Sequence, residues 1–155
     1  MRGRGGAAVG PFAPYVAAGG DDGHEYANGD VSLIAGTVIV NSFTPYAGLI
    51  FRNVNIPAGA TVTAAHINIV PNTYDDPNLV IWGEYDPASF AATSNNLSSR
   101  TKTAANVAWS AANIGLDAYH ASPDISAVIQ EIIETVGWAS GDNLALYLID
   151  NGGGP

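Results

Sequence analysis

The sequence predicts a mainly β protein, an antiparallel β-sandwich with a single amphipathic helix. Only 12% of the 155 residues are charged and 47% are apolar, and 18 glycines and 9 prolines divide the chain into short segments. This composition is typical of a turn-rich β protein. Between the turns, apolar residues recur with period two or in short β-branched runs, which indicates strands, and one segment shows helical periodicity.

The first residues differ in character from the rest of the chain. Residues 1–20 hold six glycines and two prolines, with apolar residues scattered singly. Such a segment cannot form a core of its own, so we expect an extended arm. Its aromatic residues Phe12 and Tyr15 are expected to contact a partner subunit. Residues 21–155 are predicted to form one β-sandwich domain, since a chain of this length buries roughly two thirds of its unfolded surface.

Six strands are predicted in the domain. One of them, GLIFRNVNI, changes its apolar phase between Phe51 and Val54. A one-residue shift within a strand indicates a bulge, which we place near Arg52 or Asn53. Another, NLALYLI, is apolar on both faces, which predicts a central strand covered on each side. The predicted strands are 31–40, 48–56, 62–70, 79–85, 106–109 and 143–149.

Residues 123–136 carry the signals of the amphipathic helix. Ser122 is a favourable N-cap, Pro123 suits the first helical position, and Asp124 places a carboxylate at the positive end of the helix dipole. Gly137 is predicted to follow the helix in a left-handed conformation. One stripe of apolar residues is expected to pack on the sheet. The stripe is Ile125, Val128, Ile129, Ile132, Ile133 and Val136, and the solvent-facing residues are Gln130, Glu131 and Glu134.

The composition excludes several functions. There is no cysteine, so disulfides and thiolate metal sites are ruled out. The net charge is −9, and two of the five basic residues, Arg2 and Arg4, lie in the arm, so the domain is not expected to bind nucleic acid. No membrane span and no secretory signal peptide is recognised. His24, His66 and His120 lack zinc-binding spacing, and no nucleophile motif or phosphate-binding loop occurs.

Pairs of carboxylates are candidates for a binding or catalytic site. The pairs are Asp21 with Asp22, Asp75 with Asp76, and Glu84 with Asp86. Loop aspartates commonly cap turns and keep a surface soluble, and this is the role expected first. The two aspartate pairs are weaker candidates for a calcium site, because Ca²⁺ binds clustered oxygen ligands on flexible loops. A polysaccharide-degrading enzyme needs two carboxylates that face each other across a cleft, a separation that the sequence does not give. These carboxylates are its only support, and no enzyme activity is predicted.

Two groups of side chains are candidates for contacts. Val80, Trp82 and Tyr74 are expected on one outward face, and three interpretations stay open: a second sheet covers them, a partner subunit binds them, or a sugar ring stacks on them. Arg100 and Lys102 are nearly the only basic residues of the domain. They are expected to form structural salt bridges with the many carboxylates.

Several segments together resemble a known family. They are DDGHEYANGDVSL (21–33), GLIFRNVNIPAGATVTAAHINI (48–69), NNLSSRTKTAANVAW (95–109) and SPDISAVIQEIIETVGWASGDNLAL (122–146). They are similar to a jelly-roll-like β-sandwich domain of phage virion proteins and large secreted bacterial proteins, which is akin to carbohydrate-binding modules and disaggregatase-related repeats. The resemblance extends from about Asp21 to the C-terminus.

The resemblance implies a structural or adhesive role without a catalytic centre. Relatives commonly continue for a further strand or two after the strand that matches NLALYLI, so we expect another subunit to complete the sandwich. The partners would be copies of this chain or other virion or filament subunits. The expected function is that of a non-enzymatic structural protein of a virion or extracellular assembly, such as a phage capsid decoration, head or tail component. The alternative is a carbohydrate-binding or adhesion module of a secreted protein, with a surface glycan as its ligand.

Overall fold

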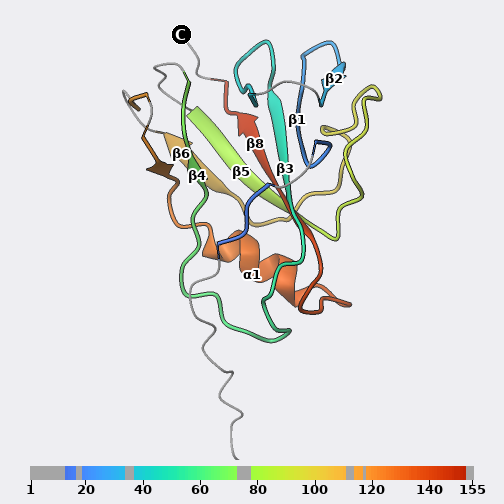
Figure 1. Cartoon of the computed structure of the whole chain (residues 1–155), viewed down its shortest axis with the longest axis vertical. Coiled ribbons are helices and arrows are strands. Elements are labelled where there is room, and N and C mark those ends of the chain that lie inside the picture. Colours follow the sequence, from blue (N-terminus) through green and yellow to red (C-terminus); the bar gives the residue numbers. More distant parts are fainter. Residues whose placement is uncertain are drawn as a thin grey trace, which may run out of the picture.

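The computed structural model describes residues 13–16, 19–33, 37–72, 78–110, 114–116 and 118–152. It confirms a mainly β, antiparallel and sandwich-like fold (Figure 1). A six-stranded sheet has the order β2-β1-β3-β8-β5-β6, and a small second sheet pairs β4 with β7. The elements are β1 (Asp22–Glu25), β2 (Val31–Ser32), β3 (Tyr46–Phe51), β4 (Asn68–Ile69), β5 (Asn78–Tyr85), β6 (Val107–Ser110), β7 (His120–Ala121), α1 (Ser126–Glu134) and β8 (Leu144–Asp150).

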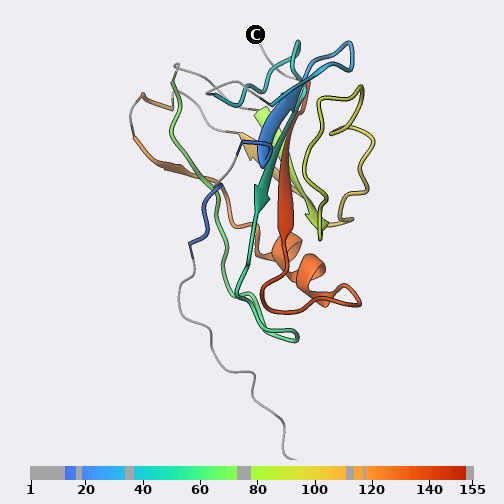
Figure 2. The same ribbon diagram turned by 45° about the vertical axis from the view of Figure 1, so that its right-hand side comes forward.

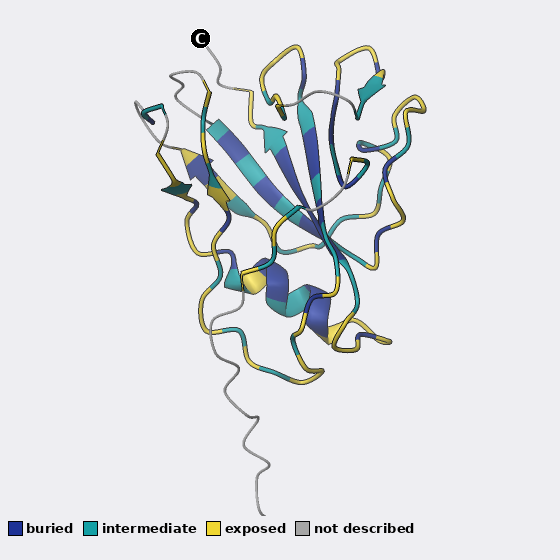
Figure 3. Cartoon of the chain, in the orientation of Figure 1, coloured by how far each residue is buried: buried dark blue, intermediate teal, exposed yellow. Residues whose placement is uncertain are grey.

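The six-stranded sheet buries side chains on both faces: alternate residues of its strands point to opposite sides, and a separate buried cluster lies on each side. Strand β8 lies between β3 and β5, and most of it is buried (Figure 3), as predicted for a central strand. Leu146 points to the side that α1 covers, which we call the helix face. Tyr147 points to the opposite side, which we call the loop face. Figure 2 shows residues 86–105 on the loop face and residues 54–70 across the sheet from them.

Helix α1 packs on β5 where that strand carries a glycine. A Cβ atom at Gly83 would lie 2.6 Å from Ile132 Cδ1 and 2.8 Å from Val128 Cγ1, so the missing side chain lets the helix approach the strand. The prediction for Val136 was wrong. Its side chain is 97% exposed because the helix ends at Glu134 and the next residue is already extended. The buried residues of the predicted stripe are Ile125, Val128, Ile129, Ile132 and Ile133.

The helix also begins later than predicted, and Ser122 does not cap it. Ser122 Oγ accepts a hydrogen bond from Ile67 N at 3.1 Å and donates one to the carbonyl of Pro123. Asp124 Oδ1 accepts hydrogen bonds from Ser126 N and from Ala65 N, both at 2.9 Å. The segment before the helix is therefore fixed by a neighbouring part of the chain.

Asp124 gives a pH dependence with a definite sign. The hydrogen bonds from the backbone of Ala65 and of Ser126 lower the pKa of Asp124 below its ordinary value of 3.8. A carboxylate with a lowered folded-state pKa stabilises the protein above the unfolded pKa, and this contribution is lost as pH falls through the folded pKa. We expect Asp124→Asn to flatten the acid-side fall in melting temperature. Equal acid limbs in Asp124→Asn and the parent chain would contradict this role.

Some predicted strands are shorter in the structure. Of residues 31–40, only Val31–Ser32 form a strand, and residues 34–36 lie outside the described part. The predicted bulge near Arg52 or Asn53 was wrong, because β3 ends at Phe51 before either residue. Asn53 has a φ of 54°, and this left-handed residue turns the chain and shifts the apolar phase.

Candidate functional site

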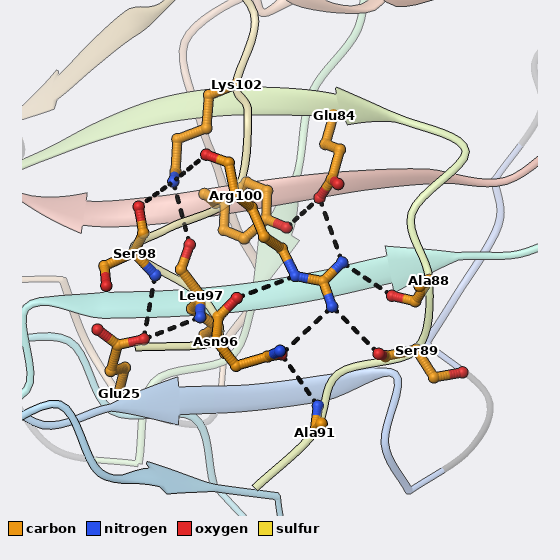
Figure 4. Close-up of polar contacts among 11 residues, drawn as sticks. Glu25, Glu84, Ala88, Ser89, Ala91, Asn96, Leu97, Ser98, Arg100 and Lys102 are labelled. Atoms are coloured by element: carbon orange, nitrogen blue, oxygen red, sulfur yellow. Dashed lines mark hydrogen bonds and ion pairs between the residues drawn. The ribbon is translucent and has the colours of Figure 1, made fainter. Parts of the chain in front are cut away.

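Charged side chains gather on the loop face beneath residues 86–105 (Figure 4). Glu25 comes from β1, Glu84 from β5, and Arg100 and Lys102 from the loop itself. Tyr147, from β8, lies among them. We call this set, Glu25, Glu84, Arg100, Lys102 and Tyr147, the polar network.

Glu25 binds N–H groups of a turn formed by residues 94–99. The residue is 2% exposed, and Oε2 accepts hydrogen bonds from Leu97 N at 2.8 Å and Ser98 N at 3.0 Å. Burial of a carboxylate is unfavourable unless it is hydrogen-bonded, and these two N–H groups supply the bonds. The same turn is closed by a hydrogen bond from Ser99 N to the carbonyl of Asn95 at 3.1 Å.

Lys102 binds carbonyl groups of the same turn and of the residue that follows it. Its Nζ donates to the carbonyls of Leu97 at 3.1 Å, Ser98 at 3.2 Å and Arg100 at 3.2 Å. It also lies 4.7 Å from the centre of the Tyr147 ring, a distance suited to a cation–π contact. Burial lowers the pKa of Lys102, and the neighbouring Glu84 and Glu25 carboxylates oppose this shift. A negative charge at the N–H end and a positive charge at the carbonyl end both complement the peptide dipoles of the turn.

Arg100 joins the two ends of the loop. Its Nη1 donates to the carbonyl of Ala88 at 2.8 Å and its Nη2 to that of Ser89 at 3.1 Å. The guanidinium also donates to the backbone carbonyl of Asn96 at 3.0 Å and to its side-chain oxygen at 3.2 Å. An ion pair with Glu84 Oε2 at 3.5 Å confirms the salt bridge expected for this arginine. The planar, multiply donating guanidinium is suited to this cross-linking role, and a lysine would not replace it.

Tyr147 and Glu84 connect the network to the sheet. Tyr147 donates its hydroxyl proton to Glu84 Oε2 and is fully buried. Burial and this hydrogen bond raise the pKa of Tyr147 above its ordinary value, so the phenol remains neutral. Phe90 of the loop packs edge-on against Tyr147 at 6.1 Å between ring centres, and Gly48 on β3 leaves room for the Phe90 ring. The carboxylates, the cations and the phenol are thus bonded to one another or to backbone groups.

The predicted calcium ligands have different surroundings. Asp21 is buried, and its carboxylate accepts hydrogen bonds from Arg52, which also donates to Ser89 Oγ at 2.9 Å. Asp22 is half-buried on β1. The described residues contain no group of three or more histidine, cysteine, aspartate or glutamate side chains that could hold a metal ion. Asp75 and Asp76 lie outside the described residues.

Of the predicted contact residues, Tyr15, Val80 and Trp82 lie within the described part of the chain. Tyr15 is 78% exposed, and Phe12 and Tyr74 lie outside the described residues. Val80 and Trp82 are both half-buried on β5, and Trp82 packs against the cluster that contains Tyr147. The ring of Trp82 is therefore partly covered, and its role in a contact stays a prediction.

Part of the polar network could be found in the sequence. Arg100 and Lys102 are the only charged residues between positions 87 and 110, and a cation isolated in an uncharged segment needs a partner. Lys102 differs from the prediction, because its hydrogen-bond partners are backbone carbonyls. Glu25 and Tyr147 were missed, because no local pattern shows that they lie beside the loop.

Comparisons of the chain with family models, with curated proteins and with solved structures found no match. In the part of the chain that the structure describes, no helix has the length and apolar character needed to cross a membrane. The arguments for function therefore rest on the geometry of the domain.

Proposed function

We propose that this chain is a non-enzymatic structural protein of a virion or extracellular assembly, acting through the edge of its main sheet. The observation that carries the proposal is the edge strand β6. It pairs with β5 on one side, and within the described residues no strand pairs with its other side. Charged residues and prolines commonly protect a free edge strand, and Val107–Ser110 include neither. Such an edge is suited to receive a strand from a neighbouring subunit.

The polar network supports a structural role. The side chains that acid–base chemistry would use, Glu25, Glu84 and Lys102, are bonded to the loop or to the sheet. These bonds fix residues 86–105 on the loop face instead of presenting reactive groups to a substrate. A rigid scaffold of this kind suits a subunit that must keep its shape in an assembly.

A lysine on the edge strand tests the proposal. Ala108 is exposed on β6, and Ala108→Lys would place a charge where a second strand must pack. We expect the parent chain to form oligomers or bind its particle, and Ala108→Lys to lose this with an unchanged melting temperature. Ala64→Lys, at another exposed alanine, is the matched control. Light scattering after size exclusion and particle co-sedimentation measure both properties. A parent chain that stays monomeric and binds no particle would refute the proposal.

A second candidate, a carbohydrate-binding or adhesion module, is favoured by two exposed aromatic rings at one end of the sheet. Phe43 is 80% exposed, although Asn41 Oδ1 accepts a hydrogen bond from its backbone N at 2.9 Å. The carbonyl of Phe43 accepts a hydrogen bond from Ala27 N at 2.9 Å, next to Tyr26, which is 39% exposed. These hydrogen bonds fix the backbone that carries the two exposed rings, and exposed aromatic rings can stack on sugars. Glycan-array binding that is lost in Phe43→Ala and kept in Tyr119→Ala would support this function, and an array without binding would count against it.

A further inference from the structure

Three backbone carbonyl oxygens of residues 97–100 converge on a single point on the loop face. They belong to Leu97, Ser98 and Arg100, and each lies 3.1 to 3.2 Å from Lys102 Nζ. Carbonyl dipoles that converge on one point repel one another, so a positive charge at that point stabilises the arrangement. The face of the Tyr147 ring closes another side at 4.7 Å. We infer that residues 97–100 form a site for a primary ammonium ion, which is occupied by the chain's own Lys102.

The dimensions of the site favour an ammonium group over a metal ion. Calcium binds oxygen at roughly 2.3–2.6 Å and prefers carboxylate ligands. Here the distances from the nitrogen to the carbonyl oxygens are those of N–H···O hydrogen bonds, and three acceptors match the three protons of an ammonium group. The nearby carboxylate, Glu25, is not a fourth ligand, because its Oε2 accepts from Leu97 N and Ser98 N.

The network around the site explains why its occupant must be charged. Glu25 adds a negative charge at the opposite end of the same turn, and Glu84 lies close enough to Lys102 to affect its pKa. A neutral side chain of similar length would fill the space but leave the carbonyls of Ser98 and Arg100 without a donor, and that of Leu97 with only a bond from Arg100 N at 3.5 Å. It would also leave two carboxylates without this cation. The site therefore selects a cation of primary ammonium type, and its natural occupant is covalently attached, so no external ion is needed.

Shortening Lys102 should convert this internal ligand into a binding site for a free ion. Lys102→Ala removes the last three methylene groups and the ammonium, which together correspond to n-propylammonium. We expect Lys102→Ala to melt at a lower temperature than the parent, and n-propylammonium chloride to restore part of the loss by mass action. Neutral n-propanol should not restore it. Lys102→Met should be destabilised and gain nothing from the ion, because the methionine side chain occupies the site.

Two comparisons make the test decisive. The parent chain, whose site is filled, should respond to neither n-propylammonium nor a calcium chelator. If Lys102→Ala does not fold in sodium buffer, recovery of its β-sheet circular dichroism by n-propylammonium replaces the melting measurement. The inference is overturned if Lys102→Met is as stable as the parent, if n-propanol acts like n-propylammonium, or if n-propylammonium has no greater effect on Lys102→Ala than on the parent.

Discussion

Replacing Glu25 by alanine is expected to lower the free energy of unfolding by about 3 kcal/mol or more. The carboxylate is 2% exposed and accepts two backbone hydrogen bonds, from Leu97 N and Ser98 N. Removing it leaves two N–H groups without an acceptor, and each unsatisfied buried group costs roughly 1–3 kcal/mol. It also removes a negative charge near Lys102, which stays in its site with fewer counter-charges.

Urea unfolding of three variants separates these contributions. Glu25→Gln keeps one acceptor oxygen and loses the charge. Its free energy of unfolding should therefore lie between that of Glu25→Ala and that of the parent chain. Glu134→Ala, at an exposed position of α1, should change the free energy of unfolding by less than about 0.5 kcal/mol. Amide hydrogen exchange should show the greatest loss of protection at Leu97 and Ser98 in Glu25→Ala. Equal stability of Glu25→Ala and Glu134→Ala would show that the turn does not depend on this carboxylate.

The strands that the sequence predicts best are those whose signal is local. Alternation in residues 79–85 and the doubly apolar run at 143–149 correctly predict β5 and the central strand β8. Side chains of a strand must alternate whatever its neighbours are, so this pattern survives in the sequence. Residues 62–70 show the limit of such reasoning. Ala65, Ile67 and Ile69 are less exposed than their neighbours, yet only Asn68–Ile69 are paired in a strand.

The polar residues of the helix show why other contacts could not be predicted. Gln130 and Glu131 occupy the positions expected to face solvent. In the structure, Gln130 Oε1 accepts a hydrogen bond from Val62 N at 2.8 Å. The carboxylate of Glu131 accepts from Ala104 N and Ala105 N, both at 2.7 Å. These side chains bind segments far away in the sequence whose backbone groups lack strand partners, and no periodicity encodes which segment passes beside the helix.

The polar network was only partly predictable for the same reason. Arg100 and Lys102 stand out as isolated cations, and the pairing of Arg100 with Glu84 agrees with the expected salt bridge. Glu25 could not be assigned to the turn at 94–99, because the two lie about seventy positions apart and meet only through the order of strands in the sheet. Charge composition thus indicates that partners exist, and the topology decides which groups they are.

The end of the helix provides a second large effect, with its own control. Ile132 and Val136 both belong to the apolar stripe that the sequence predicts. Ile132 is 0% exposed and lies against the Gly83 position of β5, whereas Val136 is 97% exposed beyond the end of α1. We expect Ile132→Ala to lower the free energy of unfolding by about 2–5 kcal/mol, because it removes buried methyl groups and leaves a cavity. Val136→Ala should change it by less than about 0.5 kcal/mol.

Chemical unfolding of the two variants therefore decides where the packed face of the helix ends. Similar losses in both would mean that the helix continues to Val136 and packs there, as the i, i+3, i+4 pattern alone indicates. A loss confined to Ile132→Ala would mean that the extended backbone of Thr135 ends the packed face. A methyl group added to the strand supplies an independent check. In Gly83→Ala this methyl group would crowd Ile132. The substitution should therefore lower the free energy of unfolding less in an Ile132→Ala background than in the parent chain.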